Sequence, residues 1–362
     1  MATQTQEPTR QTGTSEDFPQ ATDPYRRELL AHCYRMTGSV HDAEDLVQET
    51  YLRAWRAYHG FEGRSSVRTW LYRIATNVCL TALEGRNRRP LPAGLGAPSV
   101  DAGSPLEENG EIPWLEPVPD AMLDDGSPDD PLAVVTDRET IRLAFVAALQ
   151  HLPARQRAVL ILRDVLRWKA AEVAEAMETT TASVNSALQR AHATLEKANL
   201  SAETVAEPTA EQKAMLERYV DAFWRKDIES IVSMLTKDAV WEMPPFTGWY
   251  QGADNIGRLI DTQCPGGVHD MRMVQTRANG QPAFGLYMRG DDGGFHPFHL
   301  QVLTLGPDGV EHVGAFFEAS LFEVFGLPAA LTPDGEPREA GHGGQVALDA
   351  HHPGVGRRPA DT

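Results

Sequence analysis

Two consecutive helical patterns between His41 and Pro90 constrain the fold of this chain more than any other part of its sequence. Ser39 can serve as the N-cap of the first pattern, and Asp42 suits the positive end of a helix dipole. Side chains that can pack then recur at helical spacing and predict one buried face. That face comprises Ala43, Leu46, Val47, Thr50, Tyr51, Ala54, Trp55 and Tyr58.

A second stripe of the same helix is acidic. It contains Asp42, Asp45, Glu49 and Leu52, with Gln48 beside it. An acidic row that includes an apolar side chain favours docking onto a basic, partly apolar partner.

The second helical pattern has the opposite charge. Its apolar face comprises Val67, Trp70, Leu71, Ile74, Ala75 and Val78. The other faces and the following segment carry Arg68, Arg73, Asn77, Arg86, Arg88 and Arg89. Few functions need one helix that binds a basic partner and a next helix that binds a polyanion. The alternative is a helical hairpin whose charged surface only faces solvent.

The runs DAEDLVQETYLRAW and RTWLYRIATN resemble region 2 of the sigma-70 family of RNA polymerase sigma factors, of the small extracytoplasmic-function type. The resemblance implies binding to core RNA polymerase, through its beta-prime clamp helices and beta flap, and to promoter DNA. It assigns the clamp-helix contact to Asp45, Gln48, Glu49 and Leu52. It also implies that the loop from Phe61 to Thr69 captures a flipped base of the −10 element, which requires stacking and edge contacts. The candidate DNA contacts of this region are Phe61, Arg68, Trp70, Arg73, Asn77, Arg86, Arg88 and Arg89.

A net charge of −18 is unusual for a protein that binds nucleic acid. The acidity is concentrated away from the arginine-rich stretch, because residues 24–90 hold 11 Arg and 7 acidic residues. Residues 91–136 hold 10 acidic residues and no Lys or Arg. A length of 362 residues predicts two or three domains.

Cysteine usage predicts a reducing compartment, because the three cysteines are widely separated and odd in number. Cys33 and Cys79 are expected as small buried side chains, and no metal or cofactor is expected. No signal peptide or run of 18 apolar residues is found. A soluble cytoplasmic protein without a membrane partner is the expectation.

The predicted domain order is a disordered N-terminus (1–22), sigma region 2 (23–90), an acidic linker (91–136), a helix-turn-helix domain (137–200), an α+β domain (208–326) and a disordered tail (327–362). The linker contains an apolar island, Ile112–Asp120, that either docks elsewhere or lies free. Its candidate regulatory residues are Trp114, Leu115, Glu116 and Pro117. In the tail, His342, His351 and His352 are candidates for weak metal binding, with solvated low complexity as the alternative.

Residues 137–198 read as helices that end in a helix-turn-helix, which resembles sigma region 4 and its reading of the −35 element. The outward face of the last helix has side chains suited to base edges and phosphates in a major groove. These are Thr181, Ser183, Asn185, Ser186, Gln189 and Arg190. Two positions depart from the family pattern: Lys169 stands where a Ser-type cap is common, and Glu178 stands where the turn commonly has Gly.

The run DAFWRKDIESIVSMLTKDAVWEMPPFTGWYQG lies within residues 208–326. It resembles the SnoaL-like, or NTF2-like, α+β cone fold, in which a curved sheet wraps around a pocket. Its candidate pocket residues are Asp221, Glu242, Trp249, His299 and Glu318. A buried carboxylate there could act as a general base, but no local motif pairs a nucleophile with a base. Ligand sensing and a pure protein-contact role are therefore both kept, and no enzymatic activity is expected.

The fold expected for the whole chain is multidomain, with all-α regions 2 and 4 followed by an α+β SnoaL-like domain. The expected function is that of an alternative sigma factor whose C-terminal domain regulates it in cis. One proposed route is that this domain and the linker island hold the free protein in a form that binds DNA poorly. The alternatives are a ligand-responsive helix-turn-helix regulator, or a SnoaL-like enzyme fused to a DNA-binding module.

Overall fold

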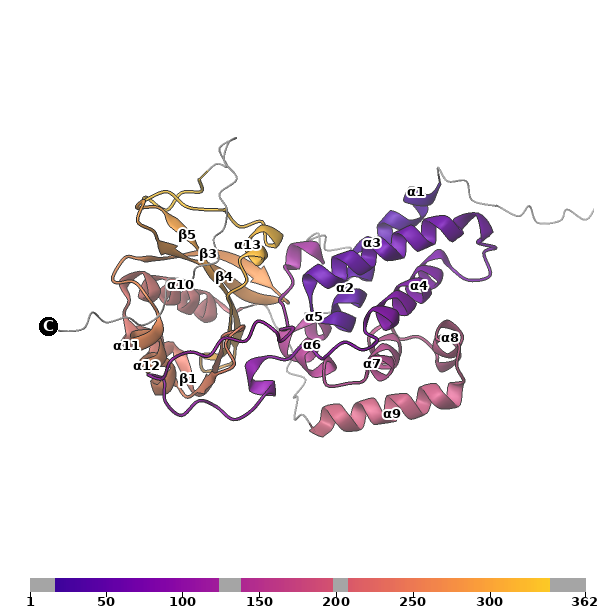
Figure 1. Cartoon of the computed structure of the whole chain (residues 1–362), viewed down its shortest axis with the longest axis horizontal. Coiled ribbons are helices and arrows are strands. Elements are labelled where there is room, and N and C mark those ends of the chain that lie inside the picture. The colour runs from indigo at the N-terminus through magenta and orange to yellow at the C-terminus, as the bar shows by residue number, and fades with distance from the viewer. Residues whose placement is uncertain (1–16, 124–137, 198–207, 339–362) are drawn as a thin grey trace, which may run out of the picture. The chain divides into compact units, whose positions relative to one another are not determined.

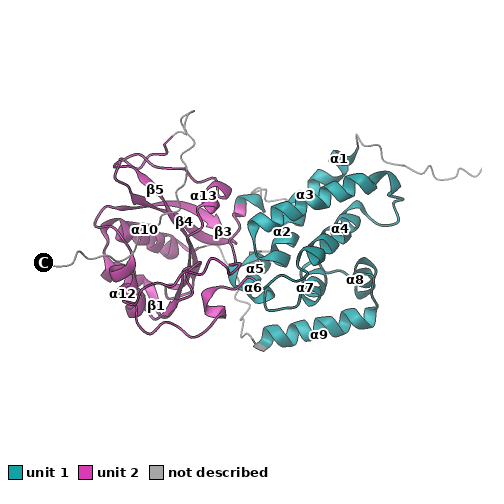
Figure 2. Cartoon of the chain, viewed as in Figure 1, with its two compact units in different colours: residues 1–88, 121–203 teal, residues 89–120, 204–362 magenta. Residues whose placement is uncertain are grey.

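The computed structural model describes residues 17–123, 138–197 and 208–338 (Figure 1). The chain forms two compact units, coloured separately in Figure 2. The first consists of Met1–Arg88 and Ala121–Glu203, and the second of Arg89–Asp120 and Thr204–Thr362. No helix within the described residues is long and apolar enough to cross a membrane.

The first part of unit 1 is a bundle of helices with locally encoded ends. The helices are α1 (Phe18–Thr22), α2 (Arg26–Thr37), α3 (Val40–Ala57) and α4 (Val67–Ala82), with a short 3-10 turn at Asp23–Tyr25. Gly38 ends α2 in the left-handed conformation, and Ser39 Oγ accepts a hydrogen bond from Asp42 N–H at 3.1 Å to begin α3. Ser66 caps α4 in the same way. These are the two helices predicted from the opening patterns.

Helix α1 corrects the expectation of a disordered segment throughout residues 1–22. Phe18 is buried and packs edge-on against Tyr58, with ring centroids 5.2 Å apart. The hydroxyl of Tyr51 donates to the carbonyl of Thr22 at 2.8 Å. Aromatic contacts with α3 therefore order the end of a polar segment whose local sequence gives little reason for order.

The second part of unit 1 contains the helix-turn-helix. Its helices are α5 (Arg138–Ile141), α6 (Leu143–Leu149), α7 (Ala154–Leu160), α8 (Ala170–Ala176) and α9 (Thr181–Lys197), with a π-turn at Ile161–Val165. Glu172 accepts a hydrogen bond from the backbone N–H of Lys169, so the N3 carboxylate satisfies a donor at the start of α8 without a Ser-type cap. Glu178 adopts φ 51° in the turn, so the left-handed shape is kept although a residue other than Gly occupies it.

Unit 2 contains a six-stranded sheet in the order β2-β1-β6-β5-β4-β3. The strands are β1 (Leu235–Glu242), β2 (Trp249–Gln251), β3 (Met271–Ala278), β4 (Gln281–Arg289), β5 (Phe295–Leu305) and β6 (Val310–Phe316). Neighbouring strands are antiparallel except β1 and β6. The helices are α10 (Ala210–Arg225), α11 (Ile228–Met234), α12 (Ala253–Gln263) and α13 (Ser320–Val324).

The strand register divides the sheet into two faces. Trp241 is paired with Val313, and Val313 with Leu303, so these side chains share one face. Helices α10, α11 and α12 cover this face, because their apolar residues share its core cluster. Glu242, one residue from Trp241, points to the opposite face. The predicted fold class, helical sigma regions followed by an α+β domain, is confirmed.

Residues Arg89–Asp120, which we call the strap, belong to unit 2. The sequence predicted an extended linker here, but the strap hydrogen-bonds at several separate places on unit 2. The backbone N–H of Ser99 donates to Trp249 O at 2.7 Å, and that of Asn109 donates to Pro245 O at 3.0 Å. Non-local hydrogen bonds and buried apolar side chains such as Leu115, not periodicity, order this segment.

The segment after Leu327 also differs from the predicted disordered tail as far as Arg338. Leu331 is buried, and its backbone exchanges hydrogen bonds with Phe295 on β5 at 2.8 and 2.9 Å. An extra sheet-edge contact therefore extends the domain beyond its predicted end. The tail histidines lie outside the described residues.

Candidate functional site

The surface of α3 brings together the predicted acidic stripe and an apolar patch. Asp45 and Gln48 are exposed, and Glu49 is half-buried and pairs with Arg53 at 2.6 Å. Leu52 is 50% exposed and Trp55 is 53% exposed. Trp55 was predicted to be buried, and that prediction is wrong.

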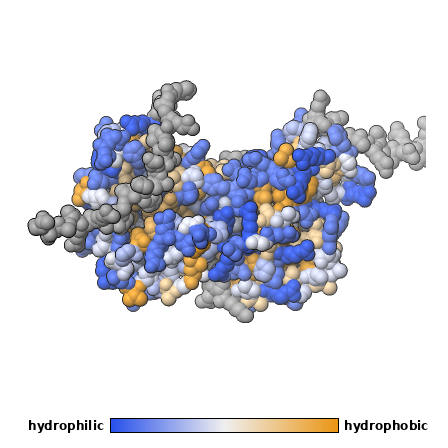
Figure 3. Space-filling view, in the orientation of Figure 1, coloured by the Kyte–Doolittle hydropathy of each residue, from blue (hydrophilic) through white to orange (hydrophobic). Residues whose placement is uncertain are grey.

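Helical spacing explains the position of Trp55. It follows Leu52 by three residues, so the two side chains are neighbours on one helix face. They are two of the few large apolar side chains that are exposed in the described part of the chain. The face in Figure 3 is mostly hydrophilic with small, separate apolar patches. We name Asp45, Gln48, Glu49, Leu52 and Trp55 the α3 surface.

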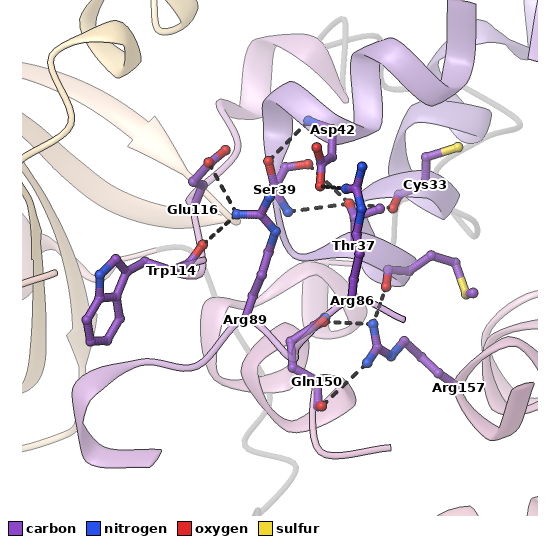
Figure 4. A network of polar contacts seen from close by, with 11 residues as sticks. Cys33, Thr37, Ser39, Asp42, Arg86, Arg89, Trp114, Glu116, Gln150 and Arg157 are labelled. Carbon is purple, nitrogen blue, oxygen red and sulfur yellow. Dashed lines mark hydrogen bonds and ion pairs between the residues drawn. The ribbon is translucent and has the colours of Figure 1, made fainter. Parts of the chain in front are cut away.

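Asp42, at the start of α3, is not available as a free acid of this stripe. Its carboxylate pairs with the Arg86 guanidinium at 3.0 Å, beside the Ser39 cap (Figure 4). Arg86 was predicted to contact DNA, and in this structure one of its donors is engaged by Asp42.

Three aromatic side chains gather where α3, the following loop and α4 meet. The rings of Phe61 and Trp70 are 4.9 Å apart, and Tyr58 stacks on Phe61 with an interplanar angle of 7°. Phe61 and Trp70 are half-buried, so part of each ring is open to a partner. Such a platform suits stacking on an unstacked base, whichever base it is.

Arg68 has a structural partner that the sequence did not reveal. Its guanidinium binds both oxygens of Glu28, at 3.0 and 2.8 Å from Nε, and Glu28 is fully buried. Tyr72 also donates to this carboxylate at 3.1 Å. Hydrogen bonding to Glu28 raises the pKa of Arg68 despite its partial burial. Arg68 therefore neutralises a buried acid, whatever contact it makes with DNA.

The remaining predicted DNA-binding residues of the α4 region do not form one free basic surface. Arg73 pairs with Glu178 at 3.0 Å, and Asn77 is half-buried. Arg88 lies 2.9 Å from His151 Nδ1, and desolvation with the charge of Arg88 lowers the pKa of His151.

Arg89 belongs to unit 2, where it holds the strap. Its guanidinium donates to the carbonyl of Trp114 at 3.0 Å and lies 3.6 Å from Glu116 (Figure 4). The Trp114 indole donates within the strap, to Asn109 O at 3.0 Å. Leu115 and Pro117 are buried. The apolar island is thus ordered within the strap and unit 2.

The predicted recognition face lies on α9. Thr181, Ser183, Asn185, Gln189 and Arg190 are exposed, and Ser186 is half-buried. Val184 and Ala191 are fully buried and hold the opposite face against the bundle. Arg190 donates to Ser186 Oγ at 2.6 Å, so the two ends of one helical turn are joined.

The cysteines of unit 1 are buried, as the sequence predicted. The sulfur atoms of Cys33 and Cys79 are 3.6 Å apart and fully buried, and their contact and burial raise the pKa of Cys79. Such thiols are poor nucleophiles. Within the described residues, no group of three side chains has the arrangement of a metal site.

The covered face of the sheet in unit 2 holds a buried polar chain. Tyr219 donates to Gln301 Oε1 at 2.9 Å, and Gln301 Nε2 lies 2.9 Å from His299 Nε2. Burial lowers the pKa of His299 to about 3, so its imidazole is neutral. His299 Nδ1 and Trp241 Nε1 are buried and have no hydrogen-bond partner among the described residues.

The predicted pocket residues do not converge. Asp221 and Glu318 are exposed, and Asp221 pairs with Arg225 one helical turn away. Glu242 lies on the opposite face from His299, where it accepts hydrogen bonds from His312 and from the strap backbone at Ala93, both at 2.7 Å. Strand alternation separates the two.

Trp249, the fifth candidate, faces the strap. Its indole donates to the carbonyl of Gly96 at 2.9 Å. A groove of about 590 Å³ lies elsewhere, between α11 and α12, with Val232, Gly257 and Arg258 in its lining.

Comparison with family models divides the chain in the same way. The Sigma-70 region 2 model matches residues 22–89, the Sigma-70 region 4 model matches 142–195, and the SnoaL-like domain model matches 216–318. The first two matches cover the α3 surface and the recognition face of α9. The third covers the sheet of unit 2.

Curated relatives give the same grouping. The chain is 59% identical over 319 residues to the ECF RNA polymerase sigma factor SigG of Mycobacterium tuberculosis, which covers 87% of this chain and 85% of that protein. It is 28% identical over 188 residues to the ECF RNA polymerase sigma factor SigW of Bacillus subtilis, covering 51% of this chain and 90% of SigW.

A solved structure shares the fold. The Mycobacterium tuberculosis extracytoplasmic function sigma factor SigJ aligns with a TM-score of 0.55 at 23% identity. The alignment covers 84% of this chain and 97% of that chain.

Proposed function

Because this chain belongs to the extracytoplasmic-function sigma factors, which direct RNA polymerase to promoters, we propose that unit 1 divides that task among four surfaces. The α3 surface binds the beta-prime clamp helices of core polymerase. The second helical part of unit 1, which contains α9, binds the beta flap. The platform formed by Phe61 and Trp70 receives a base of the −10 element, and Arg73 on α4 contacts the same DNA. The exposed face of α9 reads the −35 element.

The observation that carries the polymerase contact is the exposure of Leu52 and Trp55 beside Asp45 and Gln48. Exposed large apolar side chains rimmed by polar residues are typical of a protein interface. The acidic side chains favour a basic partner, which argues for protein and against DNA at this surface. A regulator that binds DNA without polymerase has no use for it.

Replacement of Leu52 and Trp55 by Ala tests this proposal. Trp is among the residues most often found at interface hot spots, where truncation costs about 2 kcal/mol or more, so affinity for core polymerase should fall at least about 30-fold. Val268, 61% exposed in unit 2, provides the matched control as Val268→Ala. Equal affinities of both variants, measured by surface plasmon resonance, would refute the α3 assignment.

The DNA contacts are separable by their salt dependence. Gln189→Ala or Arg190→Ala should weaken binding to the −35 element by about 1–3 kcal/mol if the side chain reaches a base edge. A base contact reduces sequence preference, whereas a phosphate contact reduces the slope of affinity against salt. No change in either quantity would show that another face of α9 reads DNA.

We propose that unit 2 regulates unit 1 in cis through the strap, which connects its two helical parts. Sigma factors are not enzymes, and we assign unit 2 no reaction, because its candidate acids lie on different faces from His299. If unit 2 binds a small ligand, the candidate polar contacts are Nδ1 of His299 and Nε1 of Trp241, which have no partner among the described residues. Single-round transcription with and without a strap-releasing substitution, described below for Asn279, tests the regulation.

A further inference from the structure

The two helical parts of unit 1 are in direct contact. Tyr72 on α4 meets Trp168, before α8, edge to face with ring centroids 5.8 Å apart, and both side chains are buried. Arg157 on α7 is buried and donates to the carbonyl of Met36 at the end of α2. Figure 4 shows the Arg157 guanidinium directed at Gln150 as well. The helix-turn-helix therefore packs against the helices that carry the proposed −10 contacts.

At the rim of this contact lies an ion pair between two functional elements. A guanidinium nitrogen of Arg73, on α4, is 3.0 Å from Glu178 Oε1, in the turn of the helix-turn-helix. Arg73 is 43% exposed and Glu178 is 74% exposed at the side chain, so both groups are within reach of a competing charge.

The turn itself does not need a glutamate side chain. It is closed by backbone hydrogen bonds, from Glu178 N–H to Glu175 O at 3.3 Å and from Thr179 N–H to Ala174 O at 2.8 Å. Glu178 sits at φ 51°, where Gly is free of strain and a residue with a Cβ is not. Within the described residues, the contact of the Glu178 side chain is with Arg73. Glu178 thus strains the backbone of the turn, while its carboxylate stabilises the contact between the two helical parts of unit 1.

We infer that Glu178 is an internal inhibitor of Arg73. Its carboxylate occupies the guanidinium that the proposed function assigns to promoter DNA, and so reduces DNA binding by the free protein. This inference rests on that proposed function. Phosphate must displace the carboxylate, so the ion pair and DNA compete for one cation.

The expected size of the effect follows from the exposure of the pair. Exposed ion pairs contribute little, so removal of the carboxylate should raise affinity for DNA by about two- to fivefold, equivalent to about 0.4–1 kcal/mol. The gain should shrink as salt is added, because salt screens the ion pair and DNA binding alike.

The test uses the full-length protein and a short fluorescent DNA duplex of arbitrary sequence, with affinity measured by anisotropy at low ionic strength. Glu178→Gln removes the charge and keeps the strained backbone. Glu175→Gln, on the exposed face of α8, makes the same change in net charge and is the matched control. Glu178→Gln should bind DNA about two- to fivefold more tightly than Glu175→Gln.

A double-mutant cycle with Arg73→Gln separates this inhibition from a general charge effect. In the Arg73→Gln background, Glu178→Gln should bind DNA no better than Glu175→Gln. A gain that persists in this background, or no gain in the wild-type background, would overturn the inference. If Glu178→Gly raised the affinity for DNA and Glu178→Gln did not, the inference would also be overturned. Relief of backbone strain in the turn would then be the cause.

The same data separate failure of the inference from failure of the proposed function. If Arg73→Gln alone leaves DNA binding unchanged, the assignment of Arg73 to DNA fails, and the inhibition fails with it. If Arg73→Gln weakens DNA binding while Glu178→Gln and Glu175→Gln bind DNA equally well, only the inhibition fails.

Discussion

At the scale of single residues, the most consequential group is the fully buried carboxylate of Glu28. Its charge is balanced by Arg68 and its lone pairs are occupied by Arg68 and Tyr72. A buried charge that loses its partner is strongly destabilising. Sequence patterning placed Arg68 among the DNA-binding residues, but any variant of it will also change stability.

Arg68→Met should lower the free energy of unfolding of unit 1 by about 3–5 kcal/mol, because Glu28 is left buried without a counter-charge. Arg64→Met is the matched control, since Arg64 pairs with Glu62 at the exposed surface and should change stability by less than about 0.5 kcal/mol. Thermal unfolding followed by circular dichroism measures both. A common melting temperature for the two variants would contradict the account.

His299 makes unit 2 sensitive to acid. Burial lowers its pKa to about 3, from 6.5 in the unfolded chain. Between these values the unfolded chain binds a proton that the folded chain does not, so stability falls as pH decreases below 6.5. The loss should approach about 1.4 kcal/mol per pH unit.

His299→Gln should flatten this dependence for the unfolding transition of unit 2, measured by denaturant titration between neutral and mildly acidic pH. Burial and the charge of Arg35 lower the pKa of His32 to about 3, so His32 gives the stability of unit 1 a similar dependence on pH. An equally steep slope for unit 2 in the His299 variant would show that other groups are responsible.

At the scale of elements, the strap is the feature that the sequence did not predict. Helix ends were predictable because capping is local: Gly38 and Ser39 act within a few residues. The three-residue strand β2 is too short to leave a pattern, and the strap is ordered by partners more than a hundred residues away. Periodicity also could not decide whether Trp55, at the edge of a stripe, is buried.

The candidate site in unit 2 shows the same limit. Residue type suggested Asp221 and Glu242 as partners of His299, but the sheet register and the outer face of α10 separate them. The α9 face was easier to predict, because one helical period fixes all its members relative to one another.

Asn279 fixes one end of the strap and offers an element-scale test. It is buried at φ 56°, its backbone N–H donates to Val118 O, and its Oδ1 accepts from Val118 N–H, both at 3.0 Å. Asn279→Gly keeps the backbone conformation and removes the carboxamide. The Val118 N–H then loses its acceptor, which costs about 1–3 kcal/mol for a buried donor. Hydrogen exchange at this amide should accelerate by about tenfold for each 1.4 kcal/mol lost.

Asn279→Ala should accelerate this exchange further, since alanine is strained at positive φ. The Ser99 amide, bonded to Trp249 at the other end of the strap, is the internal control and should be unchanged. Unchanged exchange at Val118 in both variants would show that Asn279 does not hold the strap. Single-round transcription by the same variants tests regulation in cis.

At the scale of the whole molecule, unit 2 is built from two separated parts of the chain. A protein ending after residue 200 keeps the strap but loses the core of unit 2, to which the strap contributes Ala102 and Leu106. Such a fragment should expose apolar surface, seen as increased binding of the dye ANS relative to full-length protein. Replacing residues 90–119 of the fragment by a Gly/Ser segment of equal length should abolish the increase.

Equal dye binding by the two fragments would show that the strap finds other cover without unit 2. The comparison also matters for transcription with truncated protein. A change in activity on deletion after residue 200 has two possible sources, the missing sheet and the released strap, and only the Gly/Ser fragment separates them.

The discontinuity of unit 2 sets an order of events during synthesis on the ribosome. Translation proceeds at about 5–20 residues per second, so Asp120 is made roughly 10–45 s before Arg338 completes the described part of the sheet unit. The first helical part of unit 1 is already made when this interval begins, and the second is made within it, while the strap between them has no partner. The nascent chain therefore carries, for many seconds, an acidic segment with an uncovered apolar island between two helical parts that are already made. A chaperone that binds this island would act after the helices are made and before the sheet is complete.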